Sequence, residues 1–141
     1  MLNSNSAEAW SVGGWVKNWL GEPEAAIERF ARAMRLSPLD PSQRMPSGTA
    51  HAHFFLGRYD EAASCAAMAL QDNPDYQPGL RIAAASNAMA GRPEQVHKAV
   101  ARLRQLNPAL RVSNLKAVLG PWRADDLARY EEGLRQAGLP E

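Results

Sequence analysis

The sequence predicts an all-α protein, an α-solenoid of three similar helix hairpins followed by a C-terminal capping segment. Three observations support this fold class. Related segments recur at a spacing of 34 to 36 residues, a glycine divides each segment into two parts, and a proline ends each segment, at positions 38, 74 and 108. Units of this size cannot bury their apolar faces alone, so the three are expected to stack around one continuous core.

The glycines Gly21, Gly57 and Gly91 are expected to form the corner of each hairpin. Glycine readily adopts the left-handed backbone conformation that ends a helix. Pro23 and Pro93 follow two of these corners and suit the first turn of the next helix, where a missing N–H group is harmless. Each unit is therefore predicted to contain two helices joined by a tight turn.

The expected second helices of the first and third units each present one apolar stripe, because residues three and four apart lie on the same face of a helix. We expect these stripes to face the core. Their residues are Ala26, Ile27, Phe30, Ala33 and Met34 in the first unit, and Val96, Ala99, Val100, Leu103 and Leu106 in the third.

The repeat resembles that of the tetratricopeptide family, whose units of about 34 residues contain two helices. The resemblance is best in the first unit and weakens along the chain. Pro46 replaces a usual tryptophan in the second unit, where regular helix is expected only from about that residue, and the third keeps little beyond Gly91 and Pro108. The signature residues of the first unit are Trp10, Gly14, Ala26, Phe30, Ala33 and Pro38.

Aligning the glycines with the family's turn position gives the expected domain organisation. The three repeats lie at 7–40, 43–76 and 77–110, with a two-residue insertion, Pro41 and Ser42, between the first two. The ends of the chain fall outside these repeats. Residues 1–6 resemble the tail of a preceding repeat, so the chain is expected to begin within an array, and residues 111–141 are expected to form capping helices.

Two helices are expected in the capping segment. Ser113 is the expected N-cap of a short helix that ends at Gly120 and Pro121. The last helix has a single apolar stripe, which includes Leu127 and Tyr130, and a polar opposite face. A terminal cap of a solenoid needs such a helix, and its acidic character suits a position near the basic third repeat.

The composition is that of an ordinary globular chain of 141 residues, 45% hydrophobic and 22% charged. No apolar run approaches the ~20 residues that a membrane helix needs, so no membrane partner is expected. The N-terminus also lacks the layout of a signal peptide. These features favour a cytoplasmic protein. A single cysteine, Cys65, cannot form an internal disulfide.

Charge is distributed unevenly along the chain. Residues 76–123 contain eight basic side chains and one acidic side chain, a balance of +7, whereas residues 1–75 have a balance of −3. The basic region is open to three interpretations: a solvated or internally paired face, a surface for an acidic protein, or a surface for nucleic acid. Nucleic acid is the least favoured, because the charges lie on several helix faces without interleaved aromatic residues.

Large aromatic residues in the first helix are open to two interpretations. Trp15 and Trp19 fall at positions that line the concave groove in the tetratricopeptide family, which makes them candidates for a binding surface. Packing on a preceding repeat or on the second repeat is the favoured alternative, because an aromatic stripe on a helix more often belongs to the core. The resemblance implies a protein or peptide partner. The complete set of residues expected to line the groove is Trp15, Trp19, His51, Phe54, Arg81 and Met89.

Members of the family that hold the C-terminal carboxylate of chaperone tails use basic and asparagine side chains at set groove positions. Only Arg81 is suitable here. The groove is therefore expected to accept an apolar or mixed segment and to be indifferent to a free carboxylate. The residues at the matching positions are Ser11, Trp15, Ser47, His51, Arg81 and Ala85.

The sequence contains no catalytic set, phosphate-binding glycine loop or cofactor motif. The chain is therefore not expected to be an enzyme, and no cofactor or metal is expected. His51 and His53 are two residues apart and would point to different sides of a helix, so they cannot share a metal ion as an i,i+4 pair could.

A narrower resemblance suggests the biological setting. Residues 126–141 look like the end of tetratricopeptide modules that close bacterial class III adenylate cyclases and some winged-helix transcriptional regulators. The chain is therefore expected to be the regulatory interaction module of a larger bacterial signalling protein, with an adenylate cyclase as the first choice. A free-standing scaffold and the effector arm of a winged-helix regulator are the alternatives. Self-association through Trp15, Trp19 or their apolar neighbours in the first repeat is also expected.

Overall fold

The computed structural model describes residues 6–38 and 44–141. The expected tail of a preceding repeat, apart from Ser6, and the insertion between the first two repeats lie outside these residues. The described residues form seven α-helices and one 3-10 helix, with no strand among them. The elements are α1 (Ala7–Trp19), α2 (Pro23–Leu36), α3 (Arg44–Phe55), α4 (Tyr59–Asp72), α5 (Gln77–Ala90), α6 (Pro93–Leu106), η1 (Val112–Ala117) and α7 (Ala124–Gln136).

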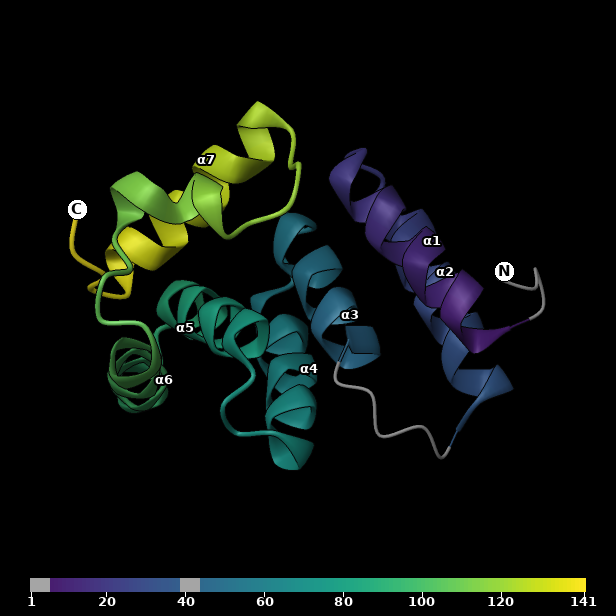
Figure 1. Cartoon of the computed structure of the whole chain (residues 1–141), viewed down its shortest axis with the longest axis horizontal. Coiled ribbons are helices and arrows are strands. Elements are labelled where there is room, and N and C mark those ends of the chain that lie inside the picture. Colours follow the sequence, from purple (N-terminus) through teal and green to yellow (C-terminus); the bar gives the residue numbers. More distant parts are fainter. Residues whose placement is uncertain (1–5, 39–43) are drawn as a thin grey trace.

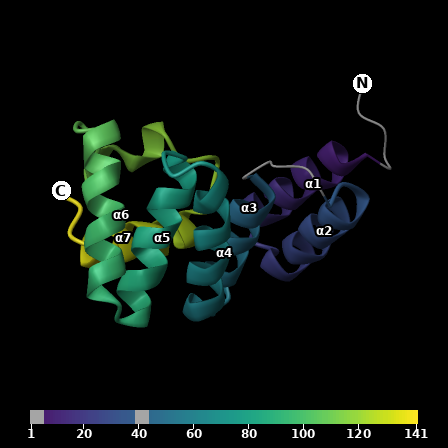
Figure 2. The same cartoon turned by 90° about the horizontal axis from the view of Figure 1, so that it is seen from below.

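The first six α-helices form three successive hairpins (Figure 1). Helix α1 packs on α2, α3 on α4 and α5 on α6, while α2 also contacts α3 and α4 contacts α5. Each hairpin is thus stacked on the next, as the view in Figure 2 also shows. The predicted fold class, an all-α solenoid of three helix hairpins with a C-terminal helical segment, is confirmed.

The predicted glycine corners are also confirmed. Gly21, Gly57 and Gly91 have φ angles of 77°, 77° and 74°, in the left-handed region. The N–H group of the residue after each glycine donates to a carbonyl five residues earlier, at 2.9 to 3.0 Å. This bond satisfies a carbonyl that the end of the helix would otherwise leave unpaired, so the corner both ends one helix and sets the direction of the next.

Helix α3 begins earlier than the sequence indicated. Its first residue is Arg44, two residues before the expected start at Pro46. Proline is tolerated at this place because the first four N–H groups of a helix have no partner within the helix. The helix can therefore include Pro46 without losing a hydrogen bond.

The first hairpin and α3 meet at the ring of Phe30, which is fully buried. A Cβ atom at Gly14 would lie 2.7 Å from the ring, and one at Gly48 would lie 2.2 Å from it. Real Cβ atoms do not approach other atoms so closely. Two glycines, one on α1 and one on α3, therefore make the space in which α2 inserts its aromatic side chain.

A second and larger part of the core joins the last two hairpins to the C-terminal segment, residues 111–141. This segment folds back on the repeats: α7 packs against α5, and η1 contacts α7 (Figure 1). The expectation that the last helix lies near the basic third repeat is confirmed. Fully buried residues of the segment include Leu115, Tyr130 and Leu134.

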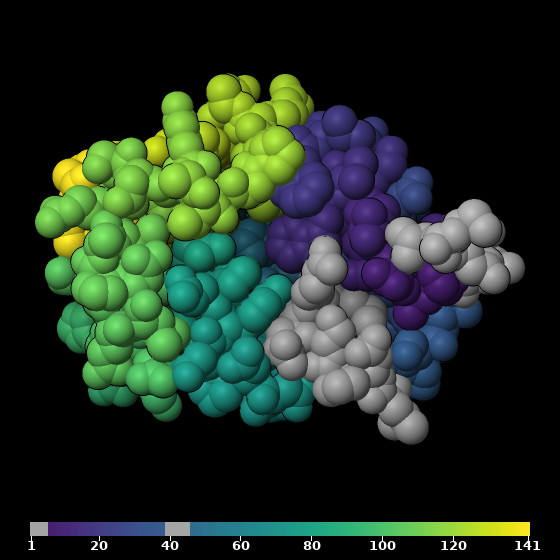
Figure 3. All heavy atoms as spheres, in the orientation of Figure 1, coloured from purple at the N-terminus to yellow at the C-terminus, as the bar shows by residue number. Residues whose placement is uncertain are grey.

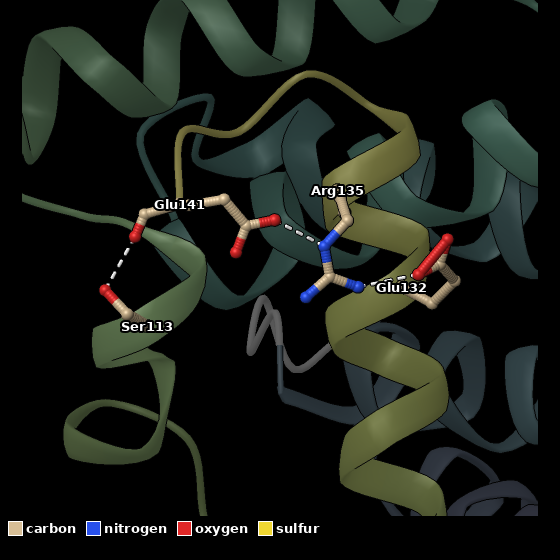
Figure 4. Close-up of polar contacts among 4 residues, drawn as sticks. All are labelled: Ser113, Glu132, Arg135 and Glu141. Carbon is tan, nitrogen blue, oxygen red and sulfur yellow. Dashed lines mark hydrogen bonds and ion pairs between the residues drawn. The ribbon is translucent and has the colours of Figure 1, made fainter.

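The start of the C-terminal segment differs from the prediction. The Val112–Ala117 stretch is a 3-10 helix, and its N-cap is Arg111 instead of Ser113. The Ser113 hydroxyl donates a hydrogen bond to the backbone carbonyl of Glu141 at 2.6 Å (Figure 4). Glu141 also accepts from Arg135 through its carboxylate. Ser113 thus ties η1 to the end of the chain, a long-range contact that no local capping rule could reveal.

Candidate functional site

Four of the six predicted groove residues are buried. Trp15 is 9% exposed, His51 3%, Phe54 1% and Arg81 6%. Trp19 and Met89 are half-buried. The four buried side chains lie on α1, α3 and α5, the first helix of each hairpin, and they face the C-terminal segment. We call this surface of α1, α3 and α5 the inner face.

A cavity of about 190 Å³ brings four of the predicted residues together. It is lined by Trp15 and Trp19 from α1, His51 from α3 and Arg81 from α5. Phe54 and Met89 do not line it. Phe54 packs against Phe55, Tyr59 and Tyr130, and Met89 packs at the edge of the core. The remaining lining residues are Tyr76, Pro78, Val118, Leu119, Gly120 and Trp122.

Trp122 of the C-terminal segment covers the inner face. Its ring stacks on His51, with centroids 5.6 Å apart and planes at 15°. It also lies 4.9 Å from the ring of Phe55 and 6.5 Å from that of Trp15. Figure 3 shows the lime-coloured residues near 120 against the purple α1. Trp122 therefore contacts two hairpins. The sequence did not identify it because Trp122 belongs to no periodic pattern.

Tyr130 connects α7 to the inner face through hydrogen bonds. Its hydroxyl lies 3.0 Å from Nε2 of His51, and Nδ1 of His51 lies 2.6 Å from the carbonyl oxygen of Ser47. A carbonyl only accepts, so Nδ1 carries the proton and Nε2 accepts from the Tyr130 hydroxyl. The Arg81 guanidinium donates to the Tyr130 oxygen. A single chain of hydrogen bonds therefore runs from α5 through α7 to α3.

This arrangement keeps His51 uncharged. Burial lowers the pKa of His51 to about 3, the bond to Ser47 raises it in part, and the positive charge of Arg81 lowers it further. Burial also raises the pKa of Tyr130. At neutral pH both groups are neutral, and Arg81 is the charged member of the chain.

Helix α7 approaches the repeats closely at Gly133. A Cβ atom there would lie 3.0 Å from Cβ of Ala85 and 3.1 Å from the ring of Phe54. Four residues earlier, Arg129 donates from Nη1 to the carbonyl oxygen of Phe55 at 2.9 Å. This hydrogen bond satisfies a carbonyl in the last turn of α3. Helix α7 is thus fixed over both α3 and α5.

The basic region of residues 76–123 is partly paired within the chain. Arg92 forms an ion pair with Asp60, and Arg102 forms one with Asp75, each at 2.6 Å. These partners belong to the more acidic part of the chain, as one of the three interpretations of the charge pattern requires. The pairs are exposed, so each contributes about 1 kcal/mol or less.

Other features of the surface do not suggest chemistry. A cavity of about 580 Å³ lies between α4, α5 and α6, with mainly alanine, leucine and amide side chains around it. In the described part of the chain, no three His, Cys, Asp or Glu side chains form a group that could hold a metal ion. None of the described helices has the length and apolar character needed to cross a bilayer.

Comparison with solved structures identifies the fold. No family model matches the sequence, and no curated protein matches it. Several solved tetratricopeptide domains share the fold. The first tetratricopeptide domain of Spaghetti (RPAP3), bound to the HSP90 peptide SRMEEVD, has a TM-score of 0.69 at 21% identity, over 95% of this chain and 99% of that one.

Two further structures agree. The second domain of human RPAP3, in complex with the HSP70 peptide SGPTIEEVD, has a TM-score of 0.67 at 18% identity and covers 89% of this chain and 94% of its own. PilW, a type IV pilus biogenesis factor, has a TM-score of 0.69 at 19% identity, over 94% of this chain and 63% of that chain. The chain therefore has the tetratricopeptide fold.

Proposed function

We propose that this chain is a protein-interaction module that binds a peptide or protein segment on its inner face. One observation supports this function best. The inner-face residues Trp15, His51 and Arg81 are covered in part by side chains of the C-terminal segment, Trp122 and Tyr130, although Trp15 also packs on Phe30 and His51 of the repeats. The inner face thus already binds one helical segment, its own. Solved domains of the same fold carry peptides of HSP90 and HSP70.

A partner segment would have to replace part of the C-terminal segment. The segment is held near Trp15 mainly by the ring of Trp122, because the residues just before it are half-buried or exposed. Local opening of such a region costs less than global unfolding. The apparent affinity for a partner is the intrinsic affinity reduced by the fraction of open molecules. Loosening the cover should therefore strengthen binding.

The preferred segment is apolar or mixed in character. The six groove residues proposed from the sequence, Trp15, Trp19, His51, Phe54, Arg81 and Met89, offer aromatic surface and a single cation. With His51 neutral and buried, Arg81 is the only basic group among them that could pair with a carboxylate. A chaperone-tail peptide and its amidated form are therefore expected to bind equally weakly.

The setting that we propose is the regulatory end of a larger cytoplasmic bacterial signalling protein, such as an adenylate cyclase. Support for it comes from the resemblance of residues 126–141 to the ends of such proteins. A free-standing scaffold or the effector arm of a winged-helix regulator would use the same surface. The residues encoded upstream distinguish these settings: a cyclase domain, a winged helix, or neither.

The binding function can be tested with the segment that covers the inner face within the chain itself. A labelled peptide of residues 118–136 is titrated into the wild-type chain and into Trp122→Ala. Because the variant loses the stacking on His51 and Phe55, it should bind the peptide at least tenfold more tightly than the wild type does.

Trp10→Ala is the matched control, since Trp10 lies against α2 with Arg29 and Arg32 over its ring, away from the inner face. This control should bind like the wild type. Equal affinity of all three chains for the peptide would refute the proposal.

A further inference from the structure

The cavity beneath the C-terminal segment has a size and a chemistry that the proposed function does not explain. It is open to solvent on one side and has a volume of about 190 Å³, and an enclosed apolar cavity of about 150 Å³ is enough to bind benzene. Its walls include the indole rings of Trp15, Trp19 and Trp122. The space therefore suits one aromatic ring with a small substituent and is too small for an extended peptide.

Arg81 places a buried positive charge in this wall. It is 6% exposed, and it is the only residue with a permanent charge among the buried residues of the described part of the chain. None of the ion pairs between described residues involves it. A buried charge normally needs an ionic partner as well as hydrogen bonds. The Tyr130 hydroxyl is a neutral hydrogen-bond partner of Arg81, and the Nε–H group of Arg81 has no acceptor.

Three indole groups share this deficit. Nε1 of Trp10, of Trp15 and of Trp19 is buried and has no hydrogen-bond acceptor. Of these three residues, Trp15 and Trp19 line the same cavity as Arg81. The accessible lone pair of His51 is already used by Tyr130. Arg81 and these two tryptophans thus belong to the cavity wall and carry buried N–H groups that lack acceptors, and each such buried donor is costly until it is paired.

We propose that this cavity binds a small aromatic carboxylic acid, with its carboxylate at Arg81 and its ring among the three tryptophans. A carboxylate supplies the negative charge that Arg81 lacks, and small shifts of the surrounding side chains would bring its lone pairs to the buried N–H groups. The aromatic walls favour a ring over a purely inorganic anion. Because the ligand contacts α1, α5 and the Gly120–Trp122 stretch together, its binding holds the C-terminal segment on the inner face and opposes the partner of the proposed function.

Benzoate is the probe, and the four tryptophan indole N–H signals in ¹H–¹⁵N spectra of the wild-type chain are the readout. We expect saturable shifts of the Trp15 and Trp19 signals with a dissociation constant on the order of 1 mM, and no shift of Trp10, which is remote from the cavity. Benzamide, which has the same shape without the charge, should bind at least tenfold more weakly. Equal binding of the two probes, or no shift up to about 20 mM benzoate, would overturn the proposal.

Two variants locate the carboxylate. Arg81→Gln removes the charge and should weaken benzoate binding at least tenfold, with an unchanged Trp10 signal as the sign that the chain is folded. Trp19→Phe keeps a ring and removes one donor at a half-buried position, so it should weaken binding several-fold. An unchanged Trp10 signal distinguishes this effect from unfolding. Unchanged benzoate affinity in both variants contradicts the assignment.

A peptide titration distinguishes this cavity from a peptide-binding site. SRMEEVD, which carries a free C-terminal carboxylate, should bind more weakly than benzoate, as judged from the concentration needed to shift the Trp15 and Trp19 signals. If it binds as tightly as benzoate, the cavity is part of a peptide site and the small-molecule assignment is wrong. The benzoate, benzamide and SRMEEVD titrations use the wild-type chain with its cover closed, so their failure leaves the Trp122→Ala experiment on the proposed function unaffected.

Discussion

His51 should make the stability of this protein sensitive to mild acid. The pKa of His51 is about 3 in the folded chain because the imidazole is buried beside Arg81, and it returns to about 6.5 when the chain unfolds. Protons therefore bind the unfolded state preferentially between these two values. The stabilising contribution is complete above pH 6.5 and is lost progressively as the pH falls toward 3.

The size of the effect follows from the two pKa values. Each pH unit below 6.5 reduces the free energy of unfolding by about 1.4 kcal/mol, so lowering the pH from 7.5 to 5 should remove about 2 kcal/mol through this one residue. Domains commonly have only about 5–15 kcal/mol in total. The loss is therefore large enough to measure by urea unfolding at a series of pH values.

His51→Gln is the informative variant, because glutamine has no titratable group. The free energy of unfolding of the wild type relative to that of the variant should fall by about 2 kcal/mol between pH 7.5 and pH 5. His53→Gln is the matched control on the same helix. Burial and the charge of Arg58 also lower the pKa of His53, but this residue is only half-buried, so its variant should keep most of the pH dependence.

If the wild type and His51→Gln lose the same free energy of unfolding as the pH falls, this reasoning is refuted. If the variant does not fold, the wild type alone can decide the question. The ¹⁵N shifts of its imidazole should show the neutral form, protonated on Nδ1, down to pH 5, since that nitrogen donates to Ser47. A midpoint near 6.5 in the folded chain would contradict the burial argument.

Three further outcomes are expected. Gly48→Ala should destabilise the chain by about 1–3 kcal/mol in urea unfolding, because its Cβ would lie 2.2 Å from the ring of Phe30. Gly13→Ala should be nearly neutral, because its Cβ would meet only a flexible arginine side chain at 3.3 Å. Equal effects of the two substitutions would contradict the packing argument. Tyr130→Phe should cost about 1–3 kcal/mol, since it leaves buried partners unsatisfied, and an unchanged midpoint would argue against the hydrogen-bond chain. Light scattering at high concentration should show self-association of the chain, and a strict monomer would count against that prediction.

The structure narrows the surface of the α1 region that could contact a second copy of the chain. Trp15, one of the two side chains expected to meet a second copy, is buried within its own chain by Trp122 and Phe30. The exposed apolar residues of this helix region are Val16, 41% exposed, and Leu20, 55% exposed. A second copy would therefore contact these two residues, and Leu20→Glu should reduce the association if this surface is responsible.

The sequence alone determined the repeated part of the fold. Glycine corners, proline stops and apolar stripes are local signals, since each depends on backbone freedom or on a spacing of three and four residues. For this reason the hairpins and the helical stripes of residues such as Phe30 and Leu103 could be predicted. The same periodicity placed Trp15, His51, Phe54 and Arg81 on the first helices of the hairpins, where the structure has them.

Only the tertiary structure decided what those residues contact. The hydrogen bond between His51 and Tyr130 joins residues 79 positions apart, and Arg129 reaches a carbonyl 74 positions away. Trp122 stands outside any helix, so no periodicity marked it as a core residue. Contacts of this kind arise because the C-terminal segment must bury its own apolar side chains, and the surface available to them exists only after the three hairpins have stacked.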